Sequence, residues 1–309
     1  MRMLLLNPAQ MINGRPLKVK KAFVIPYPVY MIAGQTPSEW TIDVANDYTD
    51  DINYDGDYDL VGITLSTIHS VRGYQIAEEF RKRGKTVVMG GFHATLFTDE
   101  ALQYADAVVA GEAEYVWPQL LEDFKAGRLK KLYKAEKLPR PQDLAPPRYD
   151  LINRKRYMVD VMPAETSRGC PFACNYCSVT EFYGQKYRVR PPRDVVRDVR
   201  STKTRFISFV DDNVAANKAK AAELFEELIP GKDFLDESGH DSPGGRRETP
   251  RALGAFRIPL RDRGFGNAGP HQPGGRAQDA GQSGGGVCGP REGVPAVQHH
   301  GLRQLDVRL

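Results

Sequence analysis

Short apolar runs alternate with amphipathic segments through the first 130 residues, and no other feature limits the possible folds as strongly. The runs predicted as strands are Met3–Leu6, Asp59–Leu65, Thr86–Met89 and Ala107–Ala110. The segments predicted as helices are Val71–Arg83, Asp99–Tyr104 and Val116–Lys125. This alternation is typical of a parallel sheet covered by helices. We therefore predict an α/β domain with a Rossmann or flavodoxin-like parallel sheet over residues 1–130.

Two glycines, Gly90 and Gly91, directly follow the third predicted strand. In open α/β sheets the carboxyl ends of the strands form the ligand crevice, and glycine lets a ligand approach the backbone closely. Gly90 and Gly91 are therefore candidate cofactor-binding residues, and His93 is a candidate lining residue of the crevice. A hydrogen-bonded structural role is the favoured alternative for both His69 and His93.

Beyond residue 130 the organisation changes. Residues 131–163 are rich in Lys and Pro and predict an interdomain linker. Residues 164–230 then contain two further strand–helix units. Their predicted elements are a strand at Ala164–Ser167, a basic amphipathic segment at Arg193–Thr202, a strand at Phe206–Val210 and a helix at Ala215–Ile229.

Residues 231–309 have a different composition from the rest of the chain. They hold 17 of the 29 Gly and 10 Arg against one Lys, and they contain no Tyr or Met. A natural disordered tail is one interpretation. We favour a change of reading frame near residue 230, because a GC-rich gene read one base out of register gives such a composition. No function is inferred from these residues.

Charge and hydropathy exclude some classes of protein. The net charge is +2 before residue 231 and +2 after it, which gives neither part the strong basic excess of a nucleic-acid-binding surface. The apolar start Met1–Leu6 is too short for a signal peptide, and no run approaches the ~18 apolar residues of a membrane-spanning helix. The sequence therefore predicts a cytoplasmic protein without a nucleic-acid partner or a transmembrane segment.

Three of the four cysteines lie within eight residues, as Cys170, Cys174 and Cys177. Three thiolates on one tight loop can bind three irons of a [4Fe-4S] cluster and leave the fourth iron open to another ligand. A structural zinc site requires four ligands, and no further Cys or His lies near this loop. We predict the cluster; zinc and incidental thiols are the alternatives.

The stretch from Thr166 to Cys177, with an aromatic residue before the last cysteine, resembles the first strand and cluster loop of the radical S-adenosylmethionine (radical SAM) superfamily. The resemblance implies that Cys170, Cys174 and Cys177 hold the cluster and that SAM chelates the open iron. It also implies reductive cleavage of SAM to methionine and a 5′-deoxyadenosyl radical, within a (β/α) barrel that is incomplete here. Tyr176 would then lie beside the adenine, or else be a core aromatic of the loop.

Asp211 and Asp212 close the second strand of this region, where the family often contacts the SAM amino group. The glycines usual at that place are missing, so the match is one of position and polarity. A cap on the following helix is an equally good role for Asp212. Arg188 and Arg190 either face the cofactor carboxylate or are solvated, and solvation is favoured.

Gly90–Thr95 and Ala105–Glu114 resemble the cobalamin-binding-type domain that precedes many radical SAM enzymes. The chain departs from that family at Asn7–Gln10, where it lacks the Asp-x-His-x-x-Gly loop that ligates cobalt. The resemblance therefore implies corrinoid binding without that histidine; a ligand-free scaffold is the alternative.

Together these resemblances imply an enzyme that methylates, cyclises or rearranges a small molecule of lipid or tetrapyrrole type. An electron donor such as flavodoxin or ferredoxin is the implied partner. The alternatives are an inactive fragment and a non-catalytic module that binds a corrinoid or an iron–sulfur cluster.

Overall fold

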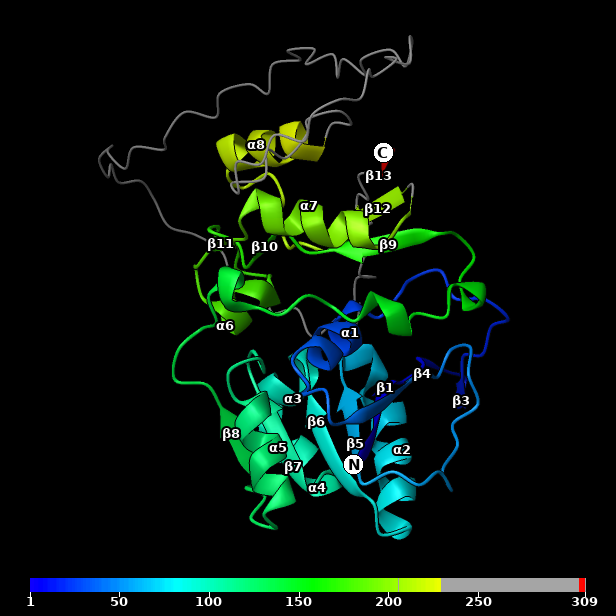
Figure 1. Ribbon diagram of the computed structural model, residues 1–309. Helices are drawn as coiled ribbons and strands as arrows, with labels where there is room; N and C mark the ends of the chain where they lie inside the picture. Colours follow the sequence, from blue (N-terminus) through cyan, green and yellow to red (C-terminus); the bar gives the residue numbers. More distant parts are fainter. Residues whose placement is uncertain (205, 229–305, 309) are drawn as a thin grey trace, which may run out of the picture. The chain divides into compact units, whose positions relative to one another are not determined.

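The computed structural model describes residues 1–204, 206–228 and 306–308. Its amino-terminal half forms a six-stranded parallel sheet, whose arrangement can be followed in Figure 1. The strands are β1 (Arg2–Asn7), β4 (Thr41–Asn46), β5 (Leu60–Thr64), β6 (Thr86–Gly90), β7 (Ala107–Ala110) and β8 (Leu132–Lys134). Their spatial order is β4-β1-β5-β6-β7-β8, and every neighbouring pair is parallel. The α/β fold class is confirmed.

Helices cover both faces of this sheet. They are α1 (Tyr27–Gly34), α2 (Ser70–Lys82), α3 (Phe92–Leu96), α4 (Thr98–Tyr104) and α5 (Trp117–Lys125). Alternate residues of β1 point into two different cores, since side chains of a strand alternate between its faces. Leu4 and Leu6 pack with Phe80 of α2, whereas Met3 and Leu5 pack with Trp117 of α5. Burial on both faces explains why β1 is an uninterrupted apolar run.

Two strands of this sheet, β4 and β8, were not predicted. Both lie at its edges, where strands carry more polar residues and lose their apolar pattern. The sequence of β4 is TIDVAN and that of β8 is LYK. β8 pairs with β7 although it lies within residues 131–163, the predicted linker. The predicted helix at Asp99–Tyr104 is confirmed as α4, but α3 directly before it was missed.

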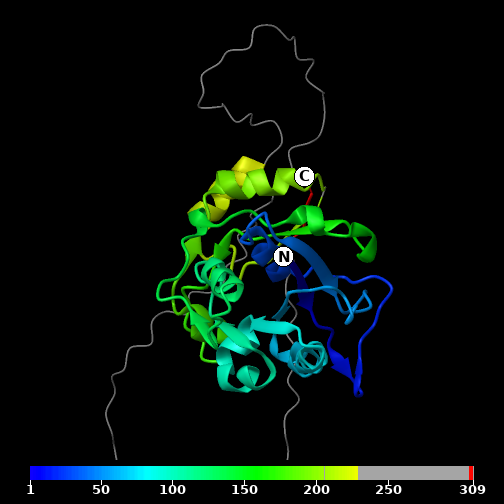
Figure 2. The same ribbon diagram turned by 60° about the horizontal axis from the view of Figure 1, so that its bottom comes forward.

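The second region begins with β9 (Val161–Ala164), which ends where the strand predicted at Ala164–Ser167 was expected to begin, and it contains the other predicted strand–helix units. Its further elements are β10 (Ser167–Arg168), α6 (Ser178–Tyr183), β11 (Arg188–Val189), α7 (Pro192–Ser201), β12 (Phe206–Phe209), α8 (Lys218–Leu228) and β13 (Asp306–Arg308). β9 pairs with β12 in parallel, as consecutive barrel strands do, and β13 pairs antiparallel with β12. Helices α7 and α8 pack against each other beside these strands (Figures 1 and 2).

Residues before and after the predicted linker share one hydrophobic core. Tyr30 of α1 belongs to the same cluster as Val196 of α7 and Ile207 of β12, and Met162 of β9, within the predicted linker, joins it. The remaining elements are the hairpin strands β2 (Met11–Ile12) and β3 (Arg15–Pro16) and the 3-10 helices Thr67–His69, Pro141–Asp143, Tyr149–Leu151 and Arg154–Arg156. Helices described in the structure are all too short or too polar to cross a membrane. The predicted tail, residues 231–309, lies outside the described residues apart from β13.

Asp47, directly after β4, has a fully buried side chain that forms ion pairs with two basic side chains. Its carboxylate lies 2.8 Å from Arg72 Nε and 2.8 Å from Lys18 Nζ, and it accepts the backbone N–H of Ala9 at 3.1 Å. Burial alone would raise the pKa of Asp47, but the hydrogen bonds from Arg72 and Lys18 outweigh it and lower the pKa below 3.8. The native state thus favours the charged form.

Asp47→Asn is expected to lower the free energy of unfolding by about 3–5 kcal/mol at pH 7, because it breaks a buried ion pair. A carboxyl with a lowered native pKa contributes stability above its unfolded value, and this stability is lost as pH falls through the native pKa. The difference from wild type should therefore shrink below pH ~4. Urea titrations at several pH values measure it. Asp43→Asn, which breaks the surface pair with Arg2, is the control and should cost about 0–1 kcal/mol.

Candidate cofactor site

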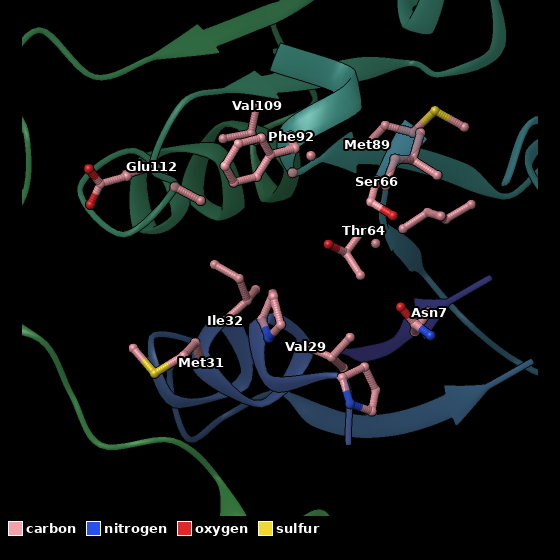
Figure 3. A pocket seen from close by; sticks show the side chains of 18 of the residues that line it. Asn7, Val29, Met31, Ile32, Thr64, Ser66, Met89, Phe92, Val109 and Glu112 are labelled. Carbon is pink, nitrogen blue, oxygen red and sulfur yellow. The ribbon is translucent and has the colours of Figure 1, made fainter. Parts of the chain in front are cut away.

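A cavity of about 380 Å³ lies at the carboxyl ends of the central strands, and Figure 3 shows it from close by. Asn7 of β1, Thr64 of β5, Gly90 of β6 and Gly111 after β7 all border it. The chain passes from β1 to β4 on one side and then to β5 on the other, so the cavity lies at the point where the strand order reverses. Open α/β sheets bind their ligands at this point.

The opposite wall of the cavity comes from α1. Val29, Met31 and Ile32 face Thr64 and Ser66 across the cavity in Figure 3. An apolar wall with a few polar groups is typical of a small-molecule site. A cavity therefore lies where the ligand crevice is predicted, and both Gly90 and Gly91 border it. Cofactor binding by these two glycines stays a prediction.

Gly91 has a structural reason to be glycine. Its φ is +93°, and an added Cβ would lie 2.8 Å from the carbonyl oxygen of Leu65. At Gly90 an added Cβ would meet Val109 only at 3.6 Å, an ordinary contact. Gly91 therefore has no room for a side chain because the backbone of Leu65 lies against it. Gly90 has room for one beside the cavity.

Gly91→Ala is expected to lower the free energy of unfolding by about 1–3 kcal/mol, the cost of a strained left-handed residue. Gly90→Ala should change it by less than about 1 kcal/mol, because no contact closer than 3.6 Å arises. Thermal or urea unfolding of both variants measures the difference. Equal losses of unfolding free energy in the two variants would contradict the structural requirement for glycine at position 91.

Of the two histidines near the crevice, His69 borders the cavity and His93 is not among its lining residues. His93 is 5% exposed, and its ring nitrogens contact Tyr74 Oη at 3.0 Å and Thr67 Oγ1 at 3.4 Å. The ring nitrogens of His69 are 2.7 Å from Ser66 Oγ and 3.0 Å from Tyr48 Oη. These contacts agree with the structural role that the sequence favours for both histidines. The prediction that His93 lines the crevice was wrong.

Cys170, Cys174 and Cys177 are free thiols on the loop between β10 and α6, and Cys174 is exposed. Gly169 opens this loop with φ +77°, where an added Cβ would collide with the carbonyl oxygen of Lys186 at 2.1 Å. Among the described residues, no three His, Cys, Asp or Glu side chains converge on a point that could hold a single metal ion. A [4Fe-4S] cluster suits three thiolates on one loop because each thiolate would bind a different iron. Cys170, Cys174 and Cys177 as its ligands stay a prediction, with zinc as the alternative.

Asp211 and Asp212 hold the start of this loop. Asp211 accepts hydrogen bonds from the N–H and Oγ1 of Thr166, at 3.1 and 2.6 Å, and from Ser167 Oγ at 2.5 Å. Burial raises the pKa of Asp211, although these hydrogen bonds oppose the rise. Asp212 accepts the N–H of Gly169 at 3.0 Å. Neither side chain borders the cavity, so contact of Asp211 or Asp212 with SAM stays a prediction.

Two interpretations of neighbouring residues need correction. Asp212 does not cap the following helix, because α8 begins only at Lys218. Tyr176 is 87% exposed, so it is not a core aromatic of the loop. A hydrogen bond with Cys174 raises the pKa of the Tyr176 hydroxyl. Contact of Tyr176 with the adenine of SAM stays a prediction.

Arg188 and Arg190 are not solvated, contrary to the favoured interpretation. Arg190 is 4% exposed and its Nη2 lies 2.5 Å from the buried carboxylate of Asp198. Arg188 forms a bidentate ion pair with Glu112 and donates to the carbonyl of Pro139 at 2.6 Å. Glu112 follows β7, so Arg188 links the second region to the crevice loop.

Arg168, two residues before Cys170, is the centre of this link. Its guanidinium lies 2.8 Å from Glu112, 2.5 Å from Glu114 and 2.9 Å from Glu165. Sequence reasoning missed this network. Its signal was the pair of acidic residues Glu112 and Glu114 directly after a buried strand, at the crevice edge of the sheet.

Aromatic packing joins the same two places. Phe92, next to Gly91, stacks on Phe182 of α6 with ring centroids 4.1 Å apart, and Tyr183 packs edge-on against Phe92. Phe182, Tyr183, Glu165 and Arg168 all border the cavity. One cavity is therefore lined both by the strand ends of the sheet and by residues that flank the cysteine loop.

Comparison with known proteins agrees with this arrangement. Residues 164–246 match the profile of the radical SAM superfamily, so the chain carries a radical SAM domain. The chain is related to bacteriochlorophyllide d C-8(2)-methyltransferase of Chlorobaculum tepidum, with 38% identity over 215 residues that make up 64% of the chain and 48% of that protein. It is also related to the anaerobic magnesium-protoporphyrin IX monomethyl ester cyclase of Cereibacter sphaeroides, with 29% identity over 50% of the chain and 31% of that protein.

The fold resembles that of TsrM from Kitasatospora setae, a radical S-adenosylmethionine methyltransferase solved with cobalamin and a [4Fe-4S] cluster bound. The TM-score is 0.55 at 17% identity, and the match covers 73% of the chain and 50% of TsrM. The chain thus spans about half the length of the methyltransferase and of TsrM, and about a third of the length of the cyclase.

Proposed function

We propose that the chain is a radical SAM enzyme with an amino-terminal cobalamin-binding domain, acting on a tetrapyrrole-type substrate by methylation, cyclisation or rearrangement. The observation that carries this proposal is the single cavity bordered by both Gly90 at the sheet and Arg168 beside the cysteine loop. Two cofactors bound at these places would lie next to each other. The relatives act, by their names, on a bacteriochlorophyllide and a magnesium protoporphyrin ester.

In this proposal Cys170, Cys174 and Cys177 hold the [4Fe-4S] cluster. When bound together with SAM, the cluster supplies the electron that cleaves SAM, and a flavodoxin or ferredoxin would supply that electron in turn. Asp211 and Asp212 fix the start of the loop by accepting hydrogen bonds from Thr166, Ser167 and Gly169. Asn213 adds a donor 3.8 Å from Cys170 Sγ, and hydrogen bonds to cluster sulfurs tune the reduction potential.

The cavity suits part of a corrinoid. Its volume of about 380 Å³ lies at the lower end of small-molecule sites, so the macrocycle itself would extend beyond it. His69 is the lining residue that could ligate cobalt, but both of its ring nitrogens are hydrogen-bonded. The corrinoid would therefore bind without a histidine ligand from this crevice. The absence of the Asp-x-His-x-x-Gly loop at Asn7–Gln10 indicates the same.

Product analysis tests the proposal. Anaerobically reconstituted protein, incubated with SAM and dithionite, is expected to release 5′-deoxyadenosine and methionine, measured by liquid chromatography. A magnesium tetrapyrrole substrate should increase this release. Absence of 5′-deoxyadenosine from a protein with a full cluster would contradict the enzymatic proposal.

A non-catalytic module or fragment that retains its cofactors is the rival function. In that case the cluster spectrum changes when SAM is added and hydroxocobalamin is retained, but no 5′-deoxyadenosine forms. The same reconstituted sample separates the two functions.

A further inference from the structure

The buried ion-pair network beside the cysteine loop contains more carboxylates than cations. The three carboxylates are Glu112, Glu114 and Glu165, and the two guanidiniums are Arg168 and Arg188. Their side chains are between 4% and 15% exposed. One carboxylate is therefore in excess, and an unbalanced buried charge is costly without a further partner. Burial raises the pKa of Glu165, and Arg168 offsets only part of that rise.

Two oxygens of this group have no partner within the described residues. Glu114 Oε2 and Glu165 Oε2 are buried without a hydrogen bond, whereas the other oxygen of each carboxylate binds Arg168, at 2.5 and 2.9 Å. Glu112 differs, since Arg168 and Arg188 together bind both of its oxygens. Buried polar atoms without a partner are rare in native proteins, and each calls for an explanation. Here both atoms belong to residues that border the cavity.

The chemistry of these two oxygens defines what they can bind. Both are carboxylate acceptors, so they repel anions and attract N–H or O–H donors. A bound group with N–H donors would form hydrogen bonds with both oxygens. Arg168 and Arg188 would stay paired with the other carboxylate oxygens of the network. A corrinoid carries such donors in the carboxamide side chains around its ring, and SAM carries them in its ammonium group.

We propose that Glu114 and Glu165 form an acceptor pair for N–H donors of the bound cofactor, supplied by the corrinoid carboxamides. The inference rests on the proposed corrinoid site and adds the residues that recognise its periphery. Glu114 favours the corrinoid as the source, because it stands on the loop after β7, at the edge of the sheet crevice. The pair would select amidated corrinoids against those with free carboxylates, which it would repel.

Titration of the reconstituted full-length protein with hydroxocobalamin, followed by visible absorbance, tests the pair. The double variant Glu114→Gln/Glu165→Gln should bind hydroxocobalamin about tenfold or more weakly, since it loses two charged acceptors. The control Glu181→Gln, at an exposed position of α6, should bind like wild type. Each single variant keeps an oxygen for Arg168 and should show a smaller loss, so the singles serve if the double variant does not fold.

Two further arms identify the donor. Wild type should bind cobyrinic acid, whose side chains are carboxylates, more weakly than hydroxocobalamin, and the double variant should narrow this gap. SAM affinity, measured by the change in the electron paramagnetic resonance spectrum, should not differ between wild type and variants. A loss of SAM affinity with unchanged hydroxocobalamin affinity would assign the donors to the ammonium and overturn the proposal.

Equal hydroxocobalamin affinity in wild type and folded variants would also overturn it, while leaving the proposed function intact. Failure of wild type to bind hydroxocobalamin at all would overturn both the inference and the corrinoid part of the proposed function.

Discussion

Cys174→Ala is expected to abolish the iron–sulfur cluster, so that anaerobic reconstitution leaves well below one iron per chain in place of about four. Two thiolates on a loop this exposed hold too few irons to keep the cluster assembled. Iron and acid-labile sulfide analysis measures the loss. Cys288→Ala is the control, because Cys288 stands outside the three-cysteine spacing and outside the described residues. Retained iron stoichiometry in Cys174→Ala would refute the ligand assignment.

Arg168→Met is expected to lower the free energy of unfolding by about 3–5 kcal/mol, as removal of one partner of a buried ion pair does. It would leave Glu114 and Glu165 buried without their cation, since the guanidinium of Arg168 pairs with both carboxylates. Urea unfolding of the full chain measures the effect.

The matched control for this variant is Arg148→Met. Arg148 also pairs with a carboxylate, Asp150 at 2.7 Å, but their side chains are 42% and 61% exposed. Solvent screening limits such a pair to about 0–1 kcal/mol. If both variants lost the same small amount of stability, the network at Arg168 would not hold the crevice loop to the second region.

Central strands of the sheet could be predicted from the sequence, whereas its edge strands could not. The central strands β1, β5, β6 and β7 are apolar on both faces and were predicted from their runs. The edge strands β4 and β8 were missed, because an edge strand needs no such run and β8 lies among lysines. Helix α1 was missed as well; it begins after Pro26, in a segment with prolines that obscure a helical pattern.

The candidate site divides in the same way. The cysteine loop is local in sequence, so its spacing alone predicted a cluster. The link from Glu112 to Arg168 joins residues 56 positions apart, so the acidic residues after β7 give a local signal but their partner does not. Arg190 and Asp198 lie eight positions apart and form a buried ion pair. The sequence does not show this pairing, so Arg190, in a basic segment, was predicted to be solvated.

The change of reading frame near residue 230 stays a prediction. The radical SAM match covers residues 164–246 and so runs past the predicted change at residue 230. The nucleotide sequence across codons 225–240 tests it. A neighbouring frame that continues with alternating strands and amphipathic helices would support the frameshift, and stop codons in every other frame would refute it.

Reconstitution of the wild-type chain with iron and sulfide, under strict exclusion of oxygen, tests the three-thiolate cluster most directly. We predict about four irons and four sulfides per chain, with a reduced-state electron paramagnetic resonance spectrum that changes when SAM is added. Zinc held in a saturated site, or no uptake of inorganic sulfide, would contradict the account.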